Sequence, residues 1–255
     1  AGGGIENNNA TVTISSAVVG GALVADGNTA GINGGGIHVS GTGATNVNGG
    51  TFQNNVAGQE GGGLWNASGI MTIDATLIES NTANAASNAN NDQGGGGVFN
   101  IGGTLIIQNG AMITNNTAPI NTGNGGGVMT DGGSVTITGS TLTGNSCARA
   151  GGGIENFNGT VTITSSTVGG AAVADGNTAG VNGGGIHVSG TGTTNVNGGT
   201  FANNVAGQEG GGLWNASGTI TIDGTTVDSN TANAGNNAGN DQGGGGVFNI
   251  GGTLI

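Results

Sequence analysis

The chain has 255 residues, of which 63 are glycine and one is proline, and its 13 acidic residues face a single Arg or Lys, giving a net charge of −12. This composition excludes a collagen-like chain, which needs a Gly-X-Y period with abundant proline, and the lack of a basic patch argues against a nucleic-acid partner. No apolar run approaches the ~20 residues of a membrane-spanning helix, so we expect no direct membrane insertion.

The chain consists of repeats at two lengths. Residues 1–106 align with residues 150–255 at a constant offset of 149, and only 18 of these 106 positions differ. A shorter unit, three glycines followed by Ile, Leu or Val, recurs at intervals of 26 to 34 residues. This period predicts a solenoid of about nine coils, five per super-repeat, because each unit can bury its apolar face only by stacking on its neighbours. The last glycines of the triplets are Gly4, Gly36, Gly63, Gly97, Gly127, Gly153, Gly185, Gly212 and Gly246.

The super-repeat defines the domain organisation. Residues 1–149 form the first super-repeat, and residues 150–255 form an incomplete second one. Ile255 matches Ile106 inside a predicted strand, and neither end carries a polar capping unit. Because uncapped solenoid ends expose strand edges, we expect the sequence to be a window on a longer repeat chain.

Short strings in each unit alternate between β-branched or other apolar residues and hydroxyl residues. They begin with TVTI at Thr11–Ile14 and continue with MTID at Met71–Asp74, SVTIT at Ser134–Thr138 and TVTIT at Thr160–Thr164. A period of two predicts strands, so the fold class is all-β, a parallel β-helix whose coils stack about 4.8 Å apart. The residues expected to point inward are Val12, Ile14, Met71, Ile73, Leu105, Ile107, Val135 and Ile137.

An asparagine follows the strands of each coil, usually in the setting apolar-x-x-Asn-x-Ala. Asparagine tolerates the left-handed conformation of a tight corner and bonds nearby backbone, so stacked coils predict an asparagine ladder. We expect the glycine triplets to form the opposite corner, where a positive φ or close backbone approach excludes a Cβ. The predicted structural ladder is Asn28, Asn55, Asn81, Asn116, Asn145, Asn177, Asn204 and Asn230.

These two motifs resemble the GGA[ILV] and FxxN repeats of the polymorphic outer-membrane proteins and related autotransporter-type surface adhesins. Phe52–Asn55 and Phe201–Asn204 fit FxxN literally, whereas elsewhere Ile, Leu or Val replaces Phe, and Gly replaces Ala in the first motif. The resemblance covers the whole chain. It implies a right-handed parallel β-helix on a secreted or surface-displayed adhesin, stalk or coat, and it carries over no catalytic residue.

A row of side chains follows the glycine triplets, one residue after the inward Ile, Leu or Val. Alternation predicts that this row faces outward, about 4.8 Å from coil to coil, as an apolar surface for a partner or a glycan. The alternative is a pleat of the opposite sense, which would bury it. We call this row the stripe, and it consists of Glu6, His38, Trp65, Phe99, Met129, Glu155, His187, Trp214 and Phe248.

The segment between each ladder asparagine and the next triplet varies in length. It is longest at Asn84–Gly94, where a polar, low-complexity string has a counterpart at Asn233–Gln242 that differs at three positions. Since all these inserts leave the same corner, they predict one decorated edge of the rod, which is either a display surface or a loop that tolerates change.

Several smaller motifs have two readings each. Asp26 and Asp175, in DGN strings, are weak calcium candidates, although the same strings are ordinary turns. Cys147 replaces the Ala of the Asn-x-Ala motif and is expected to be a small buried thiol, with an interchain disulfide as the alternative. Possible glycosylation sites with the Asn-x-Ser/Thr pattern are Asn9, Asn66, Asn115, Asn158 and Asn215.

The residues argue against an enzyme. The carboxylates are scattered, mostly one per coil, and a lone Arg cannot neutralise an acidic polysaccharide, so we expect no catalytic residue and no cofactor. An ice-binding surface has some basis in Thr-x-Thr strings such as Thr11/Thr13, but Asn46/Asn48 and Ile106/Gln108 interrupt the array.

We therefore expect a structural extracellular or cell-surface protein that forms a rigid rod or filament by coil stacking and self-associates laterally or end to end. The alternative is an adhesin that binds glycans or neighbouring surfaces through the stripe and the loop edge.

Overall fold

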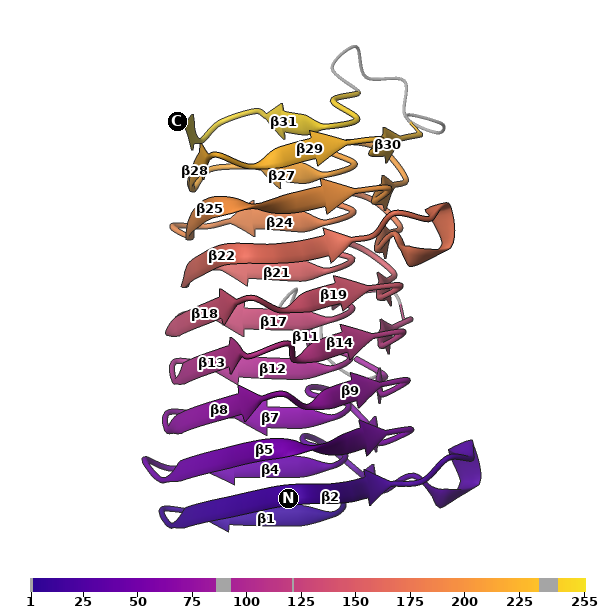
Figure 1. Cartoon of the computed structure of the whole chain (residues 1–255), viewed down its shortest axis with the longest axis vertical. Coiled ribbons are helices and arrows are strands. Elements are labelled where there is room, and N and C mark those ends of the chain that lie inside the picture. Colours follow the sequence, from indigo (N-terminus) through magenta and orange to yellow (C-terminus); the bar gives the residue numbers. More distant parts are fainter. Residues whose placement is uncertain (1, 86–92, 121, 234–242) are drawn as a thin grey trace.

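The computed structural model describes residues 2–85, 93–120, 122–233 and 243–255. These residues form a parallel β-solenoid whose coils stack along one axis from the N-terminal to the C-terminal end (Figure 1). The predicted all-β parallel β-helix is thus confirmed. Within the described residues the helical turns are η1 (Val24–Asp26) and η2 (Val173–Asp175), and none of these residues belongs to a helix long and apolar enough to span a membrane.

The strand after each glycine triplet contributes to the first sheet, which has nine parallel strands. The register places equivalent residues of successive coils side by side, as Ile37 beside Leu64. Its strands are β1 (Ile5–Asn8), β4 (Ile37–Ser40), β7 (Leu64–Asn66), β12 (Val98–Ile101), β17 (Val128–Asp131), β21 (Ile154–Phe157), β24 (Ile186–Ser189), β27 (Leu213–Asn215) and β31 (Val247–Asn249).

The alternating Thr-rich strings form the second sheet, which has 13 strands. Some coils contribute one long strand and others two short ones. The strands are β2 (Thr11–Gly20), β5 (Ala44–Gln53), β8 (Ile70–Asp74), β9 (Leu77–Glu79), β13 (Thr104–Gln108), β14 (Met112–Thr114), β18 (Ser134–Thr138), β19 (Thr141–Thr143), β22 (Thr160–Gly169), β25 (Thr193–Ala202), β28 (Thr219–Asp223), β29 (Thr226–Asp228) and β32 (Thr253–Leu254).

The third sheet has eight two-residue strands, each directly after a ladder asparagine. They are β3 (Thr29–Ala30), β6 (Val56–Ala57), β10 (Thr82–Ala83), β15 (Thr117–Ala118), β20 (Ser146–Cys147), β23 (Thr178–Ala179), β26 (Val205–Ala206) and β30 (Thr231–Ala232). A separate pair in the longer inserts joins β11 (Gln93–Gly94) to β16 (Gly123–Asn124).

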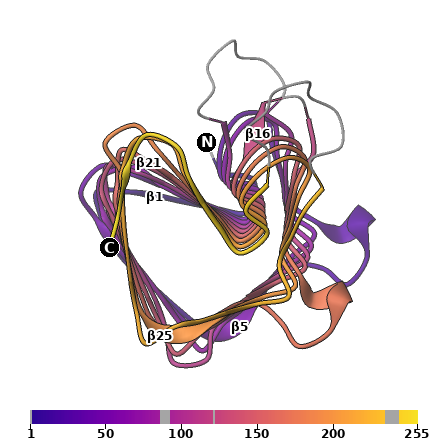
Figure 2. The same ribbon diagram turned by 90° about the horizontal axis from the view of Figure 1, so that it is seen from above.

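Seen along the axis, each coil is a ring with a smaller side lobe (Figure 2). We use side lobe for the segment from the third-sheet strand to the next glycine triplet. The ring encloses the hydrophobic core, which contains the predicted inward residues; Met71, Ile73, Leu105 and Ile107 are fully buried, and Val12 in the first coil is partly buried. A small second core of Ala118, Cys147 and Ala179 lies in the side lobe.

The ladder asparagines are joined by hydrogen bonds from Asn28 to Asn230. In the middle of the rod, Asn81 donates to the Oδ1 atom of Asn116 from its side-chain Nδ2 and from its backbone N–H, both at 3.0 Å. Asn116 in turn donates from Nδ2 to the carbonyl of Ile78 at 2.9 Å and to Oδ1 of Asn145 at 3.0 Å. Each inner ladder amide therefore makes hydrogen bonds to backbone and side-chain groups of neighbouring coils. Buried polar groups in proteins are generally hydrogen-bonded in this way.

The expectation that the ladder residue itself adopts the left-handed conformation is wrong. The positive φ falls on the residue before it, for example 56° at Asn54, 55° at Ser80 and 54° at Asn115. The physical reason is that a ladder residue needs both its N–H and its side chain directed at the next coil. The tight corner therefore falls on an exposed or half-buried neighbour.

The structure contradicts the position expected for the glycine triplets but confirms the close backbone approach expected for them. The triplet does not form an opposite corner but lies against the ladder, where the ring of each coil closes. A Cβ on Gly97 would lie 3.1 Å from Cγ of Asn116 and 2.7 Å from the carbonyl oxygen of Gly127 in the next coil. The first glycine of this triplet, Gly95, has φ +63°, a conformation that favours glycine.

Candidate functional site

The stripe forms one continuous column on the first sheet. The strand register places Glu6 beside His38, His38 beside Trp65, and Trp65 beside Phe99. The same order repeats from Glu155 through His187 and Trp214 to Phe248, and Met129 joins the two halves. The stripe therefore unites side chains from all nine strands of the first sheet.

The predicted exposure of the stripe is wrong for its central members. Relative exposure is 1% at Phe99, 0% at Met129 and 9% at Trp214. The pleat has the predicted sense, because Val98 and Val128 lie in the ring core while Phe99 and Met129 do not. These members are buried because the side lobe packs over the outer face of the first sheet, whereas Glu6 at the first coil is exposed, as predicted.

Contacts between the side lobe and the stripe show this covering directly. The indole Nε1 of Trp65 donates to Oε2 of Glu60 at 3.0 Å, and Trp214 makes the same bond to Glu209 at 2.9 Å. Both glutamates lie in the side lobe, directly before a glycine triplet. Sequence reasoning missed them, although a glutamate five residues before each tryptophan was a signal that could have been used.

Each super-repeat contains one Glu-His-Trp column. The rings of His38 and Trp65 stack with centroids 4.3 Å apart and planes within 1°. Those of His187 and Trp214 stack at 4.4 Å and within 6°. Parallel stacking leaves the edges of both rings, and not their shared faces, available to other groups.

A carboxylate holds the histidine at the base of each column. Nδ1 of His38 lies 2.9 Å from Oε1 of Glu6, to which Ser40 also donates at 3.2 Å. Burial by itself would raise the pKa of the Glu6 carboxyl, but hydrogen bonds from the Gly2 amide, from His38 and from Ser40 outweigh it and lower this pKa below its usual value. The Glu6 carboxylate is thereby held by hydrogen bonds from three groups.

The second column is more deeply buried and has the same contacts. His187 Nδ1 lies 2.9 Å from Oε1 and 2.7 Å from Oε2 of Glu155, which is 3% exposed. Ser189 donates to Oε1 of the same carboxylate at 2.9 Å. Because this hydroxyl is directed to the glutamate and not to the histidine, the Glu-His-Ser set lacks the nucleophile-to-base contact of a hydrolase triad.

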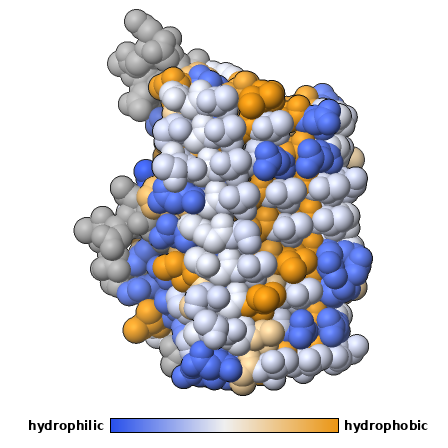
Figure 3. Space-filling view, turned by 90° about the vertical axis from the view of Figure 1, so that its left-hand side faces the viewer, coloured by the Kyte–Doolittle hydropathy of each residue, from blue (hydrophilic) through white to orange (hydrophobic). Residues whose placement is uncertain are grey.

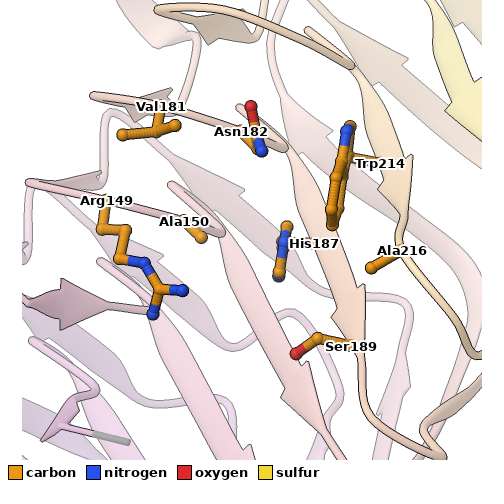
Figure 4. A pocket seen from close by; sticks show the side chains of 8 residues that line it. All are labelled: Arg149, Ala150, Val181, Asn182, His187, Ser189, Trp214 and Ala216. Carbon is orange, nitrogen blue, oxygen red and sulfur yellow. The ribbon is translucent and has the colours of Figure 1, made fainter. Parts of the chain in front are cut away.

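A pocket of about 170 Å³ lies between the second column and the side lobe. In Figure 4 the side lobe forms one wall and the outer face of the first sheet forms the other. The lining residues are Arg149, Ala150, Val181 and Asn182 from the side lobe and His187, Ser189, Trp214 and Ala216 from the sheet. The sequence did not predict this pocket, because its walls come from three coils.

The lateral face of the rod shown in Figure 3 has no continuous apolar patch. In Figure 3 hydrophobic residues form a broken vertical line between pale and hydrophilic residues. The longer predicted inserts fall partly on residues 86–92, 121 and 234–242, which lie outside the described residues, so the decorated edge stays a prediction.

The possible glycosylation sites fall into two groups. Asn66 and Asn215 are fully buried, and their Nδ2 atoms donate to Asn100 at 2.8 Å and to Asn249 at 2.7 Å. Glycosylation of these two is a wrong prediction, because the amide nitrogen that would carry the sugar is enclosed and already bonded. Asn9, Asn115 and Asn158 are exposed, and their glycosylation stays a prediction.

The calcium candidates and the cysteine occupy local structural positions. Asp26 and Asp175 end the 3₁₀ turns η1 and η2, and Oδ2 of Asp175 accepts from the Ala172 amide at 3.1 Å. Among the described residues, no group of three or more His, Cys, Asp or Glu side chains could hold a metal ion. Cys147 is a buried free thiol, and burial, with the nearby charge of Glu155, raises its pKa to about 12.

The fold and the site together define a parallel β-solenoid with two Glu-His-Trp columns, of which the second is buried and the first has an exposed glutamate. Comparisons with protein-family models, with curated proteins and with solved structures find no match.

Proposed function

We propose that this chain is a structural repeat protein that forms a rigid rod or filament at the cell surface or outside the cell. The resemblance of its GGG[ILV] and apolar-x-x-Asn motifs to surface-displayed β-helix repeats supports the location. The main observation that supports a rod function is the continuous asparagine ladder.

The ladder supports a mechanical role because it links every coil to the next through the same bonds. Between Asn55 and Asn204 each ladder amide is buried and bonded along the axis. A net contribution of about 0.5–1.5 kcal/mol per hydrogen bond, repeated in each coil, gives cohesion that does not depend on rod length. Solenoid stability of this kind is a sum of coil and interface contributions.

Self-association is the second part of the proposal. The 3₁₀ turns η1 and η2 protrude from the rod beside the second sheet (Figures 1 and 2), and Val24 and Val173 at these turns are 76% and 78% exposed. Large apolar side chains at protruding positions are suited to contact with neighbouring rods. The glycan-binding adhesin is weaker as an alternative, because the stripe does not present an open row of tryptophans.

Immunogold electron microscopy on the source cells tests the proposal. Antibodies against the exposed η1 turn should label fibres or a coat outside the cell, at regular positions along their length. Label confined to the cell interior, or to isolated particles without fibres, would contradict it.

A further inference from the structure

The two super-repeats differ in one consistent way on the outer face of the second sheet. Of the 18 positions that differ, five gain a threonine in the second super-repeat and none loses one. All five lie in strands of the second sheet, where burial alternates, and they occupy the outward positions. A change toward a single residue type on a single face indicates a contact surface of defined chemistry. The pairs are Ser15/Thr164, Val18/Thr167, Ala44/Thr193, Ile70/Thr219 and Leu77/Thr226.

Outward side chains of β18, β22, β25 and β28 form two columns along the rod axis. The strand register places them side by side from coil to coil. Seven of these eight side chains carry a hydroxyl, the eighth has an amide, and all are exposed or half-buried. The apolar interruptions of the same columns, Ala44, Ile70 and Ile106, lie in earlier coils. We call the eight residues the threonine face: Ser134, Thr160, Thr193 and Thr219 in one column, and Thr136, Thr162, Asn195 and Thr221 in the other.

The threonine face has a regular spacing in both directions. Neighbouring side chains are about 4.8 Å apart along the axis and about 6.7 Å apart across it, which is two residues of strand. Successive coils lie almost over one another when the rod is seen along its axis (Figure 2), so the columns are straight. Threonine is β-branched and restricted at χ1. Its hydroxyl and methyl groups are therefore held close to fixed positions.

The hydroxyl groups of this face are open to a partner. No described residue bonds the side-chain hydroxyls of its six threonines, and Ser134 donates to Thr104 at 3.4 Å. Each open hydroxyl has one donor and two acceptor positions. The eight side chains carry no charge, although the chain has a net charge of −12, and Asp223 follows two residues after Thr221 at the border of the face. A neutral array of this kind matches a neutral solid that repeats at the same spacings.

We propose that the threonine face binds the surface of ice. Water oxygens on that surface repeat at spacings close to those of the face, so the hydroxyls can join the lattice while the methyl groups lie between them. Single contacts to water are weak, and binding results from many that act together. The face has no aromatic side chain on which a sugar ring could stack, which disfavours a solid polysaccharide. Ice binding is independent of the rod function, since it uses neither the asparagine ladder nor the protruding turns.

Thermal hysteresis, the gap between the melting and freezing temperatures of an ice crystal in protein solution, tests the face. The wild-type protein should show a gap that grows with its concentration. The Thr193→Ala/Thr219→Ile variant carries the residues that the first super-repeat has at the same positions, and it should reduce the gap about twofold or more. The reverse variant, Ala44→Thr/Ile70→Thr, extends one column through the first super-repeat and should widen the gap.

The matched control takes its substitutions from the same source but lies outside the face. Thr167→Val/Thr226→Leu also restores residues of the first super-repeat. These positions follow the bend of the second sheet, where Ser165 has φ 48° and the strand register omits one residue pair. The control should leave the hysteresis unchanged.

Several results would overturn the proposal. They are a wild-type gap no wider than that of an unrelated globular protein at equal mass, an equal loss in the control, and a full gap in Thr193→Ala/Thr219→Ile. Pelleting of the wild-type protein with crystalline cellulose, without hysteresis, would assign the face to a polysaccharide instead of ice. If circular dichroism shows that Thr193→Ala/Thr219→Ile does not fold, an unchanged gap in folded Ala44→Thr/Ile70→Thr contradicts the proposal by itself.

Discussion

Asn116 illustrates how much one buried amide contributes to this rod. It accepts two hydrogen bonds from Asn81 and donates to Ile78 and Asn145, and it is fully buried. Alanine at this position would leave both Asn81 donors and the Ile78 carbonyl without partners inside the rod. The cost of such unsatisfied groups exceeds the net contribution of the bonds themselves.

We predict that Asn116→Ala lowers the free energy of unfolding by about 3 kcal/mol or more. Asn48 is exposed on the second sheet, and Asn48→Ala is the matched control, with an expected change within about 0.5 kcal/mol. Urea unfolding followed by circular dichroism measures both. Equal effects of the two substitutions would show that the ladder does not stabilise the rod.

The glycine triplets give a second prediction at this scale. A Cβ on Gly96 would lie 2.5 Å from the carbonyl oxygens of both Gly126 and Thr117, so Gly96→Ala must push two coils apart. The expected loss is about 3 kcal/mol or more. Gly31 has no atom within 4 Å of its Cβ position. Gly31→Ala should therefore raise the free energy of unfolding by about 0.4–1 kcal/mol, because alanine reduces the conformational entropy of the unfolded chain.

Thermal unfolding of these two variants decides the role of the triplets. If the coils pack closely on one another, the midpoint temperature of unfolding falls for Gly96→Ala and rises slightly for Gly31→Ala. If both variants unfold at the wild-type temperature, the coils are not packed as described.

At the scale of the element, the side lobe determines what the stripe can do. It covers the outer face of the first sheet, and its own small core is built from Ala118, Cys147 and Ala179. The Cys147 thiol also contacts the Ala150 carbonyl at 3.2 Å. This core has little apolar area, so the order of the side lobe depends on backbone pairing between coils.

The Cys147 thiol reports whether the side lobe is closed. Burial raises its pKa from 9.0 to about 12, so at pH 8 the folded protein should react with a thiol reagent far more slowly than the unfolded protein. A folded pKa above the unfolded one means that the neutral thiol contributes stability below pH 9, and this contribution is lost as the pH rises toward 12. Reaction at the unfolded rate would mean that the side lobe is open.

The strands and the ladder were predictable because their spacing alone determines them. Alternation places Met71 and Ile73 on one face, and the constant position of Asn81 and Asn116 within the coil brings them together. The burial of Phe99 was not predictable, since the length and composition of an insert give no indication of the direction in which it folds. The pocket escaped prediction because its lining residues, such as Arg149 and Trp214, come from different coils and share one cavity only after those coils have stacked.

At the scale of the whole molecule, the rod has an axial repeat at two lengths. Successive coils are separated by the strand spacing of about 4.8 Å, and the turns η1 and η2 recur after five coils, or 149 residues. Five layers place these protrusions about 24 Å apart along the rod. Any assembly of such rods inherits both spacings.

Cryo-electron microscopy of the native material, without refolding or truncation, tests the rod most directly. We predict continuous rods with layers about 4.8 Å apart and a lateral protrusion about every 24 Å, each aligned with the exposed Val24 or Val173 turn. Globular particles, or fibres without the layer spacing, would contradict a rod built by coil stacking.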